Sequence, residues 1–162
     1  MGNVEKGIKY VSIFSIIIMI YVLINHIIGY YFGFITTISF PLNMKNILGT
    51  LSFQLFLSGL AEEILFRAVP ISLLLFVFKR INIIKWGIAL ETIMASLLFS
   101  VAHIQWTLSP LTINFDYYQL IYSFILGIAY GKAYQDCNSI LYPILMHSIS
   151  NVIYVGVGYL VL

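Results

Sequence analysis

Apolar segments long enough to cross a lipid bilayer follow one another along most of this sequence. A membrane-spanning helix needs about 20 apolar residues. Hydrophobic residues make up 61% of the 162 residues, and charged residues only 9%. Because a soluble domain carries roughly 25% charged residues, this chain cannot cover a surface that faces water. The sequence predicts an integral membrane protein, and with a net charge of +2 and no basic run it does not indicate a nucleic-acid partner.

Polar breaks divide the chain into five predicted helical segments, at about residues 10–28, 47–78, 86–104, 117–131 and 139–162. The aromatic stretch 29–41 extends the first segment, re-enters the membrane or lies at its interface. The second segment exceeds a bilayer core of about 30 Å, so we expect it to be tilted, kinked or partly interfacial. Pro70 is the natural break point. The predicted fold is all-α, a polytopic transmembrane bundle of about five to six spans that forms a single domain over residues 1–162.

The basic residues indicate how these segments cross the membrane. If the segments alternate in direction, the Lys and Arg residues between them fall on one side, and Lys45 alone falls on the other. Cytoplasmic loops are enriched in Lys and Arg, so the N-terminus is predicted to be cytoplasmic and the C-terminus external. We expect a multi-pass protein of the cell membrane, and the Ile- and Lys-rich, Arg-poor composition is compatible with a low-GC bacterium.

Strongly polar side chains are rare inside the predicted spans, and three segments contribute one set of them: Glu62, Glu63, Arg67, His103, His147 and Asn151. Each charge at the centre of a membrane helix costs about 2.5–3.5 kcal/mol on insertion scales. A purely structural explanation would need a separate reason for every member of the set. Since ionisable residues in a membrane interior mark functional sites, the set predicts such a site.

Two of the three charges in the second segment can neutralise each other. Glu63 and Arg67 are four residues apart, so they share a helical face, and a structural ion pair explains them as well as function does. Glu62 points about 100° away and has no basic partner at its depth, which leaves a histidine, a metal or a water. A carboxylate and imidazoles around a water form a general-base arrangement. Alternatively, Glu62, His103 and His147 could bind zinc with one position open.

Three motifs occur in order, each on a hydrophobic segment: EExxxR in EEILFR, FxxxH in FSVAH and HxxxN in HSISN. Together they resemble the CAAX-processing and bacteriocin-processing (CPBP, or Abi) family of intramembrane proteases. The resemblance covers about residues 48–154, which would be the catalytic core. It implies a membrane-embedded endopeptidase whose helices enclose a polar cavity.

The resemblance also implies a role for each residue of the set. Glu62 and His103 would activate the attacking water. His147 and Asn151 would hold the oxyanion of the tetrahedral intermediate. The remaining Glu and Arg of EEILFR would shape and neutralise the site. Members of the family are catalogued as metalloproteases, yet a metal-free glutamate mechanism has been argued for some, so both zinc and no metal are open expectations.

The shortness of the chain bears on the expected substrate. It resembles a bare catalytic core without the extra helices of eukaryotic prenyl-protein proteases. We therefore expect a peptide reached through the membrane, such as a bacteriocin or signalling precursor, more than a prenylated CAAX protein. An alternative of another class is a non-catalytic immunity or scaffold protein with the same fold. A proton-coupled transporter would use the same carboxylates, but the sequence shows no inverted repeats. The oligomeric state is not predicted.

Overall fold

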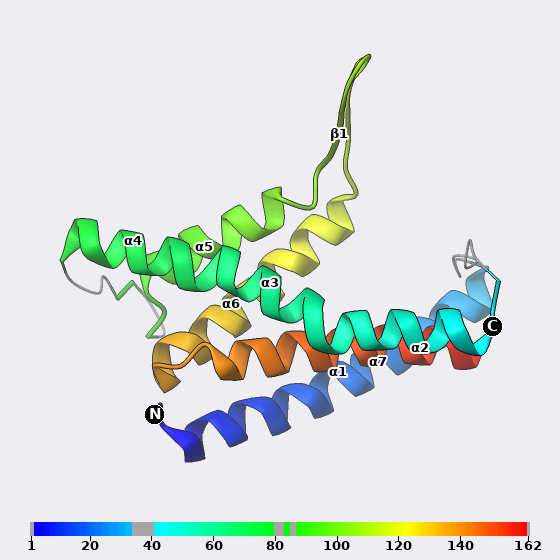
Figure 1. Cartoon of the computed structure of the whole chain (residues 1–162), viewed down its shortest axis with the longest axis horizontal. Coiled ribbons are helices and arrows are strands. Elements are labelled where there is room, and N and C mark those ends of the chain that lie inside the picture. Colours follow the sequence, from blue (N-terminus) through cyan, green and yellow to red (C-terminus); the bar gives the residue numbers. More distant parts are fainter. Residues whose placement is uncertain (1, 34–40, 80–82, 85–86, 162) are drawn as a thin grey trace.

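The computed structural model describes residues 2–33, 41–79, 83–84 and 87–161 as a helical bundle with one β-hairpin (Figure 1). The helices are α1 (Val4–Phe32), α2 (Met44–Phe53), α3 (Gly59–Glu63), α4 (Val69–Phe78), α5 (Leu90–Val101), α6 (Tyr117–Cys137) and α7 (Leu141–Val161). Two π-helical turns, η1 (Gln54–Ser58) and η2 (Ile64–Ala68), join α2 to α3 and α3 to α4. Strands β1 (Gln105–Leu108) and β2 (Leu111–Asn114) pair antiparallel. The all-α prediction is confirmed for the bundle, and the hairpin was not predicted.

Helices α2 to α4 form one continuous helical run from Met44 to Phe78, where the second segment was predicted. Its irregularities are the two π turns, which lie on either side of α3 and its glutamates. Pro70 lies in the first turn of α4, two residues after η2, and has no backbone N–H for the preceding turn, so the regular hydrogen-bond pattern is interrupted there. π turns within α-helices are frequent at functional sites. The kink expected near Pro70 thus takes the form of altered turns around the EEILFR motif.

Helices α1, α6 and α7 share the main hydrophobic core. The buried side chains of this core are Phe14, Ile18, Val22, Tyr130, Ala133, Met146 and Val157. Helix α5 packs against α6 at two glycines: a Cβ added at Gly127 would lie 2.9 Å from Ser96 Cβ, and one at Gly131 would lie 2.7 Å from Thr92 Cγ2. Small residues allow helix backbones to approach closely within membranes. This packing fixes the position of α5, which ends beside the cavity described below.

Helices α1, α5 and α6 differ in length from the predicted segments, and α6 runs to Cys137 where about 131 was predicted. Helix α1 continues into the stretch 29–41 as far as Phe32 and ends at Gly33 with a positive φ of 71°, whereas residues 34–40 lie outside the described part. Helix α5 has only 12 residues, because the chain turns after Val101 and enters the hairpin. At about 1.5 Å per residue it is roughly 18 Å long, less than a bilayer core.

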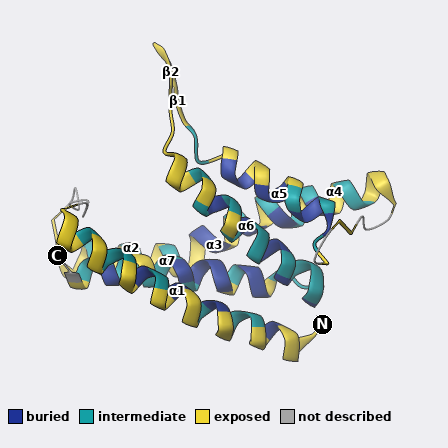
Figure 2. Ribbon diagram, turned by 180° about the vertical axis from the view of Figure 1, so that it is seen from behind, coloured by how far each residue is buried: buried dark blue, intermediate teal, exposed yellow. Residues whose placement is uncertain are grey.

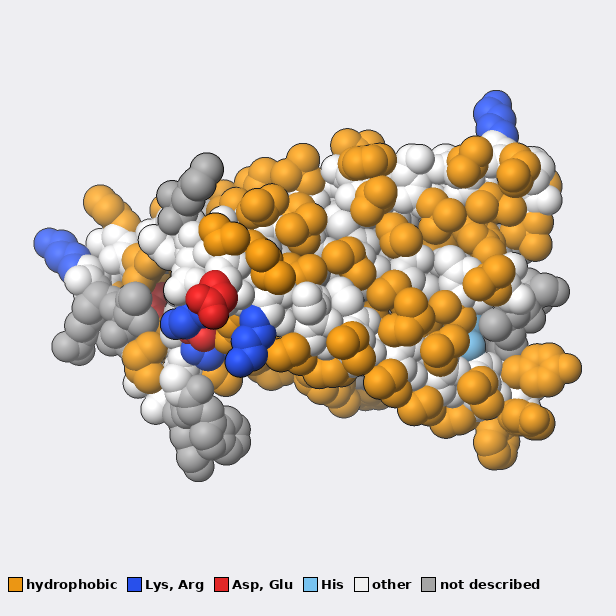
Figure 3. Space-filling view, turned by 90° about the horizontal axis from the view of Figure 1, so that it is seen from below, with side chains coloured by type: hydrophobic (Ala, Val, Ile, Leu, Met, Phe, Trp, Pro, Cys, Tyr) orange, Lys and Arg blue, Asp and Glu red, His pale blue; other side chains and the backbone are white. Residues whose placement is uncertain are grey.

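The surface of the bundle is strongly apolar. By length and composition, two of the described helices can cross a membrane: α1 over Val4–Phe32 and α7 over Leu141–Leu160. Figure 3 shows a face on which hydrophobic side chains cover the middle and charged side chains lie near the two ends. The N- and C-termini lie at opposite ends of the bundle (Figure 1). Buried residues gather where the helices face one another, and the hairpin is exposed throughout (Figure 2).

Candidate active site

A cavity of about 390 Å³ lies among α1, η1, α3, α6 and α7, next to the end of α5. Four of the residues singled out in the sequence contribute to its lining: Glu62, His103, His147 and Asn151. The other two, Glu63 and Arg67, are fully buried at 0% exposure. The fold therefore brings side chains from three separate helical segments to one polar cavity within an apolar bundle.

His147 connects the cavity with the buried ion pair. Its Nδ1 lies 2.7 Å from Glu63 Oε1, and Arg67 Nη1 lies 3.1 Å from the same oxygen. Because an ionised carboxylate can only accept, the imidazole Nδ1 carries a proton and donates it to Glu63. The other ring nitrogen, Nε2, lies 3.8 Å from Glu62 Oε2. This distance is too long for a hydrogen bond and is suited to a bridging water or substrate atom.

Arg67 is enclosed by aromatic rings as well as by its carboxylate. The guanidinium lies 4.0 Å from the centre of the Phe99 ring and 5.4 Å from that of Tyr130. Its contact with Glu63 is an ion pair without hydrogen-bond geometry, so cation–π attraction adds to its stabilisation. Tyr130 also stacks on His147, with ring centres 5.1 Å apart. These contacts hold Arg67 in a fixed position behind the cavity wall and His147 in a fixed position within that wall.

The contacts of Phe99 and His103 explain why these two residue types occur together in the FxxxH motif. The Phe99 ring contacts Arg67 and makes edge contacts with the rings of His103 and His147, at 4.8 and 5.8 Å between centres. His103 lies in the turn after α5, and its Nδ1 is 2.8 Å from the Phe99 carbonyl oxygen. A carbonyl can only accept, so Nδ1 carries the proton. In the neutral ring the lone pair is then on Nε2, the nitrogen available as a base.

Gln54 and Ser58 are site residues that sequence reasoning missed. Ser58 Oγ donates to Glu62 Oε1 at 2.9 Å and accepts from Asn151 Nδ2 at 3.1 Å. Asn151 Nδ2 also donates to Gln54 Oε1 at 3.0 Å, so both N–H groups of its amide are engaged. Their spacing could have indicated them, because Gln54 and Ser58 precede Glu62 by eight and four residues on the same helical run, and residues four apart share a helical face. As uncharged residues they were not weighed with the ionisable set.

A family comparison identifies the chain. Residues 44–153 match the family model described as "Type II CAAX prenyl endopeptidase Rce1-like". This protein belongs to the Rce1-like family. The matched region contains all six residues of the predicted set, and the resemblance to CAAX-processing proteases is confirmed. No curated protein and no solved structure matches the chain. Membership assigns the Rce1-like chain to membrane-embedded proteases of the CAAX type.

Glu62, His103 and His147 are the three residues predicted as possible zinc ligands. In residues 2–33, 41–79, 83–84 and 87–161 no three His, Cys, Asp or Glu side chains come close enough to hold one metal ion. His103 and His147 each use Nδ1 for a protein contact, which leaves a single ring nitrogen on each for any other partner. In the described residues Glu62, His103 and His147 are thus not gathered around one point, although each imidazole keeps a ring nitrogen of the kind that zinc-binding histidines use. The chemistry proposed below therefore rests on carboxylate and imidazole groups.

Proposed function

We propose that this Rce1-like protein is an intramembrane endopeptidase in which Glu62 activates a water for attack on a peptide carbonyl. The observation that carries this proposal is the shared cavity of Glu62, His103 and His147. The buried ion pair of Glu63 and Arg67 has a structural explanation. A partly exposed carboxylate that lines one cavity with two imidazoles is better explained by chemistry.

Hydrolysis can be written with the groups of the cavity. The Glu62 carboxylate takes a proton from the water while the water oxygen bonds to the carbonyl carbon. His103, with a lone pair on Nε2, helps to hold that water. When the tetrahedral intermediate breaks its C–N bond, Glu62 returns the proton to the leaving amine. General acid–base catalysis of this kind contributes roughly 10²–10⁴-fold.

His147 is the proposed donor to the oxyanion. This role requires an imidazole that carries a proton on both ring nitrogens. With Nδ1 donating to Glu63, the second proton is on Nε2, the nitrogen nearer to Glu62. A preorganised donor of this type is typically worth about 10²–10³-fold in kcat.

The proposed task of Asn151 follows from its contacts. Both of its N–H groups are donated, one to Gln54 and one to Ser58, so help to an oxyanion would require one of them to be exchanged. In the arrangement described, Asn151 orients the Ser58 hydroxyl, which in turn donates to Glu62. We therefore assign Asn151 to positioning the base and keep the oxyanion donor role for His147.

The proposal extends to location and substrate. We place the protein in a bacterial cell membrane as a multi-pass protein with its N-terminus in the cytoplasm. Termini at opposite ends of the bundle support an odd number of crossings (Figure 1). The proposed substrates are membrane-associated or secreted peptide precursors, including bacteriocin-like, signalling and CAAX-like peptides. A site built from a carboxylate and imidazoles acts on the peptide bond itself and accommodates all of these.

The decisive experiment compares variants of the full chain in lipid nanodiscs. Wild type, Glu62→Gln and His103→Ala are incubated with a farnesylated CAAX peptide and with unprenylated peptide precursors, and cleavage is followed by mass spectrometry. Glu5→Gln, an exposed glutamate in the first turn of α1, is the matched control. We expect wild type and the control to cleave and Glu62→Gln to be slower by roughly 10²–10⁴-fold. Equal cleavage by all four proteins would refute the proposal.

Metal dependence is measured on the same samples. A chelator titration and metal analysis of the purified protein separate a zinc enzyme from a glutamate-type hydrolase. Activity that survives complete metal removal supports the mechanism proposed above. If no protein cleaves any peptide but a precursor binds the cavity, the protein is an immunity or scaffold protein of the same fold.

A further inference from the structure

The β-hairpin between α5 and α6 has two chemically different faces. Strand pairing places Trp106 opposite Ile113 and Leu108 opposite Leu111. Side chains alternate along a strand, so these four share one face of the hairpin. Gln105, Thr107, Thr112 and Asn114 form the other face. The Thr107 and Thr112 hydroxyls are 2.8 Å apart there, as hydrogen-bonded partners.

The apolar face of the hairpin is open. Its side chains are 72% (Trp106), 88% (Leu108), 71% (Leu111) and 58% (Ile113) exposed. Among the described residues, the extensive contacts of each strand are with the other strand. An isolated two-stranded hairpin is marginally stable in water, and an exposed apolar surface of this kind marks an interaction site. The four side chains therefore need a cover that the described part of the chain does not provide.

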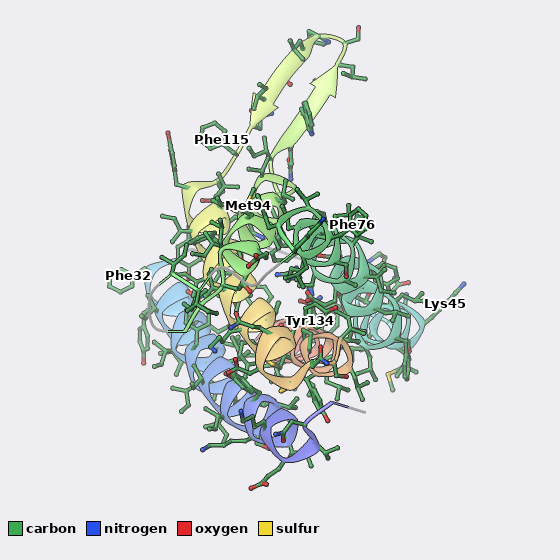
Figure 4. All side chains as sticks on the ribbon, turned by 90° about the vertical axis from the view of Figure 1, so that its left-hand side faces the viewer. Phe32, Lys45, Phe76, Met94, Phe115 and Tyr134 are labelled. Atoms are coloured by element: carbon green, nitrogen blue, oxygen red, sulfur yellow. The ribbon has the colours of Figure 1, made fainter. Side chains whose placement is uncertain are left out.

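Three observations point to lipid as that cover. The hairpin projects away from the bundle, across the direction of α7 and α2 (Figure 1). Residues 104–115 contain no charged side chain. Exposed apolar side chains are also found on the two flanking helices and at the base of the hairpin, at Leu98, Val101, Phe115, Ile121 and Ile125. Phe115 points outward at the base of the hairpin (Figure 4).

The unpaired backbone groups of the hairpin limit how deeply it can lie in the membrane. Both outer edges of a two-stranded sheet expose N–H and C=O groups, which cannot be left unsatisfied in the hydrocarbon core. Tryptophan is enriched at the membrane–water interface, and a polar threonine face needs water. A substrate strand would pair with an edge of the hairpin and leave its apolar face open. We propose that the hairpin lies on the bilayer interface, with the face of Trp106, Leu108, Leu111 and Ile113 against lipid.

The hairpin would then position the opening of the active-site cavity. Asp116, Tyr118 and Gln119 follow β2 directly and line that cavity. With the hairpin on the interface, these residues are held at the membrane surface, where a membrane-associated peptide arrives. This consequence rests on the proposed function, but the placement of the hairpin does not. The placement needs only a membrane-embedded chain.

Fluorescence quenching tests the placement without any activity assay. Trp86 and Trp106 are the two tryptophans of the chain, so Trp86→Phe leaves Trp106 as the sole reporter. The variant is placed in nanodiscs whose phosphatidylcholine carries bromine either near the headgroup or near the chain end. Aqueous iodide is titrated separately. We expect the shallow bromine to quench Trp106 more strongly than the deep bromine, and iodide to quench it weakly.

A matched control moves the reporter to the other face of the same strand. In Trp86→Phe/Trp106→Phe/Thr107→Trp the indole is expected to lose its sensitivity to brominated lipid and to be quenched by iodide. Strongest quenching by the deep bromine would overturn the interfacial placement. Protection from iodide without quenching by lipid would overturn it too, because it indicates a protein cover such as a second copy of the chain. The same pattern in a Glu62→Gln background separates this result from catalysis.

Discussion

His147 Nδ1 lies 2.7 Å from Glu63 Oε1, so a cavity-lining imidazole is held in place by a carboxylate that is completely buried. The adjacent Glu62 instead lines the cavity, with its side chain 36% exposed. The two consecutive glutamates therefore have different surroundings, because one is enclosed by protein and the other faces the cavity. Glu63 supports the structure of the site, and Glu62 is the proposed base.

Replacing Glu63 should destabilise the protein, whereas replacing Glu62 should not. Glu63→Gln keeps the shape of the side chain but leaves the fully buried guanidinium of Arg67 without a counter-charge. Breaking a buried pair in this way costs about 3–5 kcal/mol. Thermal unfolding in detergent micelles should show a markedly lower Tm for Glu63→Gln and a Tm near wild type for Glu62→Gln. Equal Tm values for the two variants would contradict the division of tasks.

Removing both charges of the buried pair should restore stability lost by removing one. In Glu63→Gln/Arg67→Met no unpaired charge remains, and the thioether is a flexible apolar side chain for the space beside Phe99. We expect the double variant to unfold at a higher temperature than Glu63→Gln alone. The double-mutant cycle, completed with Arg67→Met, gives the coupling energy directly. A double variant less stable than either single variant would contradict this explanation, because the stability would then depend on contacts of Glu63 and Arg67 other than the neutralisation of their charges.

The sequence singled out residues that share one cavity better than it predicted the scaffold that positions them. Glu62, His103 and His147 could be singled out because an ionisable group in an apolar segment is costly and therefore conspicuous. Their arrival at one cavity depends on helix packing, which the motif spacings do not contain. The bond between His147 and Glu63 was missed for that reason, since it joins residues 84 positions apart.

The π turns and the hairpin were also missed, because no pattern of charged residues indicates them. The π turns shift the helical register by hydrogen bonding alone, and a hydrophobic pattern does not report that. The hairpin has alternating apolar and polar residues on both strands, but these short strands lie between the third and fourth predicted segments, where no strand was predicted. Periodicity over four residues is too short to separate a strand from the end of a helix.

Ser58 should control the rate of the reaction without affecting the fold. Its hydroxyl joins Asn151 to Glu62, and Ser58→Ala removes both hydrogen bonds. A hydrogen bond to a charged group is worth about 1.5–3 kcal/mol, so we expect kcat to fall roughly 10- to 100-fold. KM should change little, because the substrate contacts remain. Ser15→Ala, which removes a hydroxyl bonded to the Val11 carbonyl on α1, is the control with unchanged kinetics. A rise in KM at constant kcat would instead make Ser58 a substrate-binding residue.

Asp136, near the end of α6 and beyond the predicted span, should make stability depend on pH. Burial raises the pKa of this carboxyl, but hydrogen bonds from Lys132 and Tyr10 outweigh that effect and hold the pKa below its ordinary value of 3.8. A carboxyl with a depressed pKa stabilises the folded state above its unfolded pKa, and the stabilisation is lost as pH falls through the folded value. Wild type should therefore exceed Asp136→Asn in Tm near neutral pH.

The difference between the two proteins should shrink as the pH is lowered below about 3.8, because wild-type Asp136 then becomes a neutral acid like the amide that replaces it. Tm is measured for both proteins in the same detergent across a pH series. Salt is kept constant, since Lys132 and Asp136 are partly exposed and their attraction is screened. A Tm difference that stays constant into acid would show that Asp136 stabilises the helix end by packing and hydrogen bonding rather than by its charge.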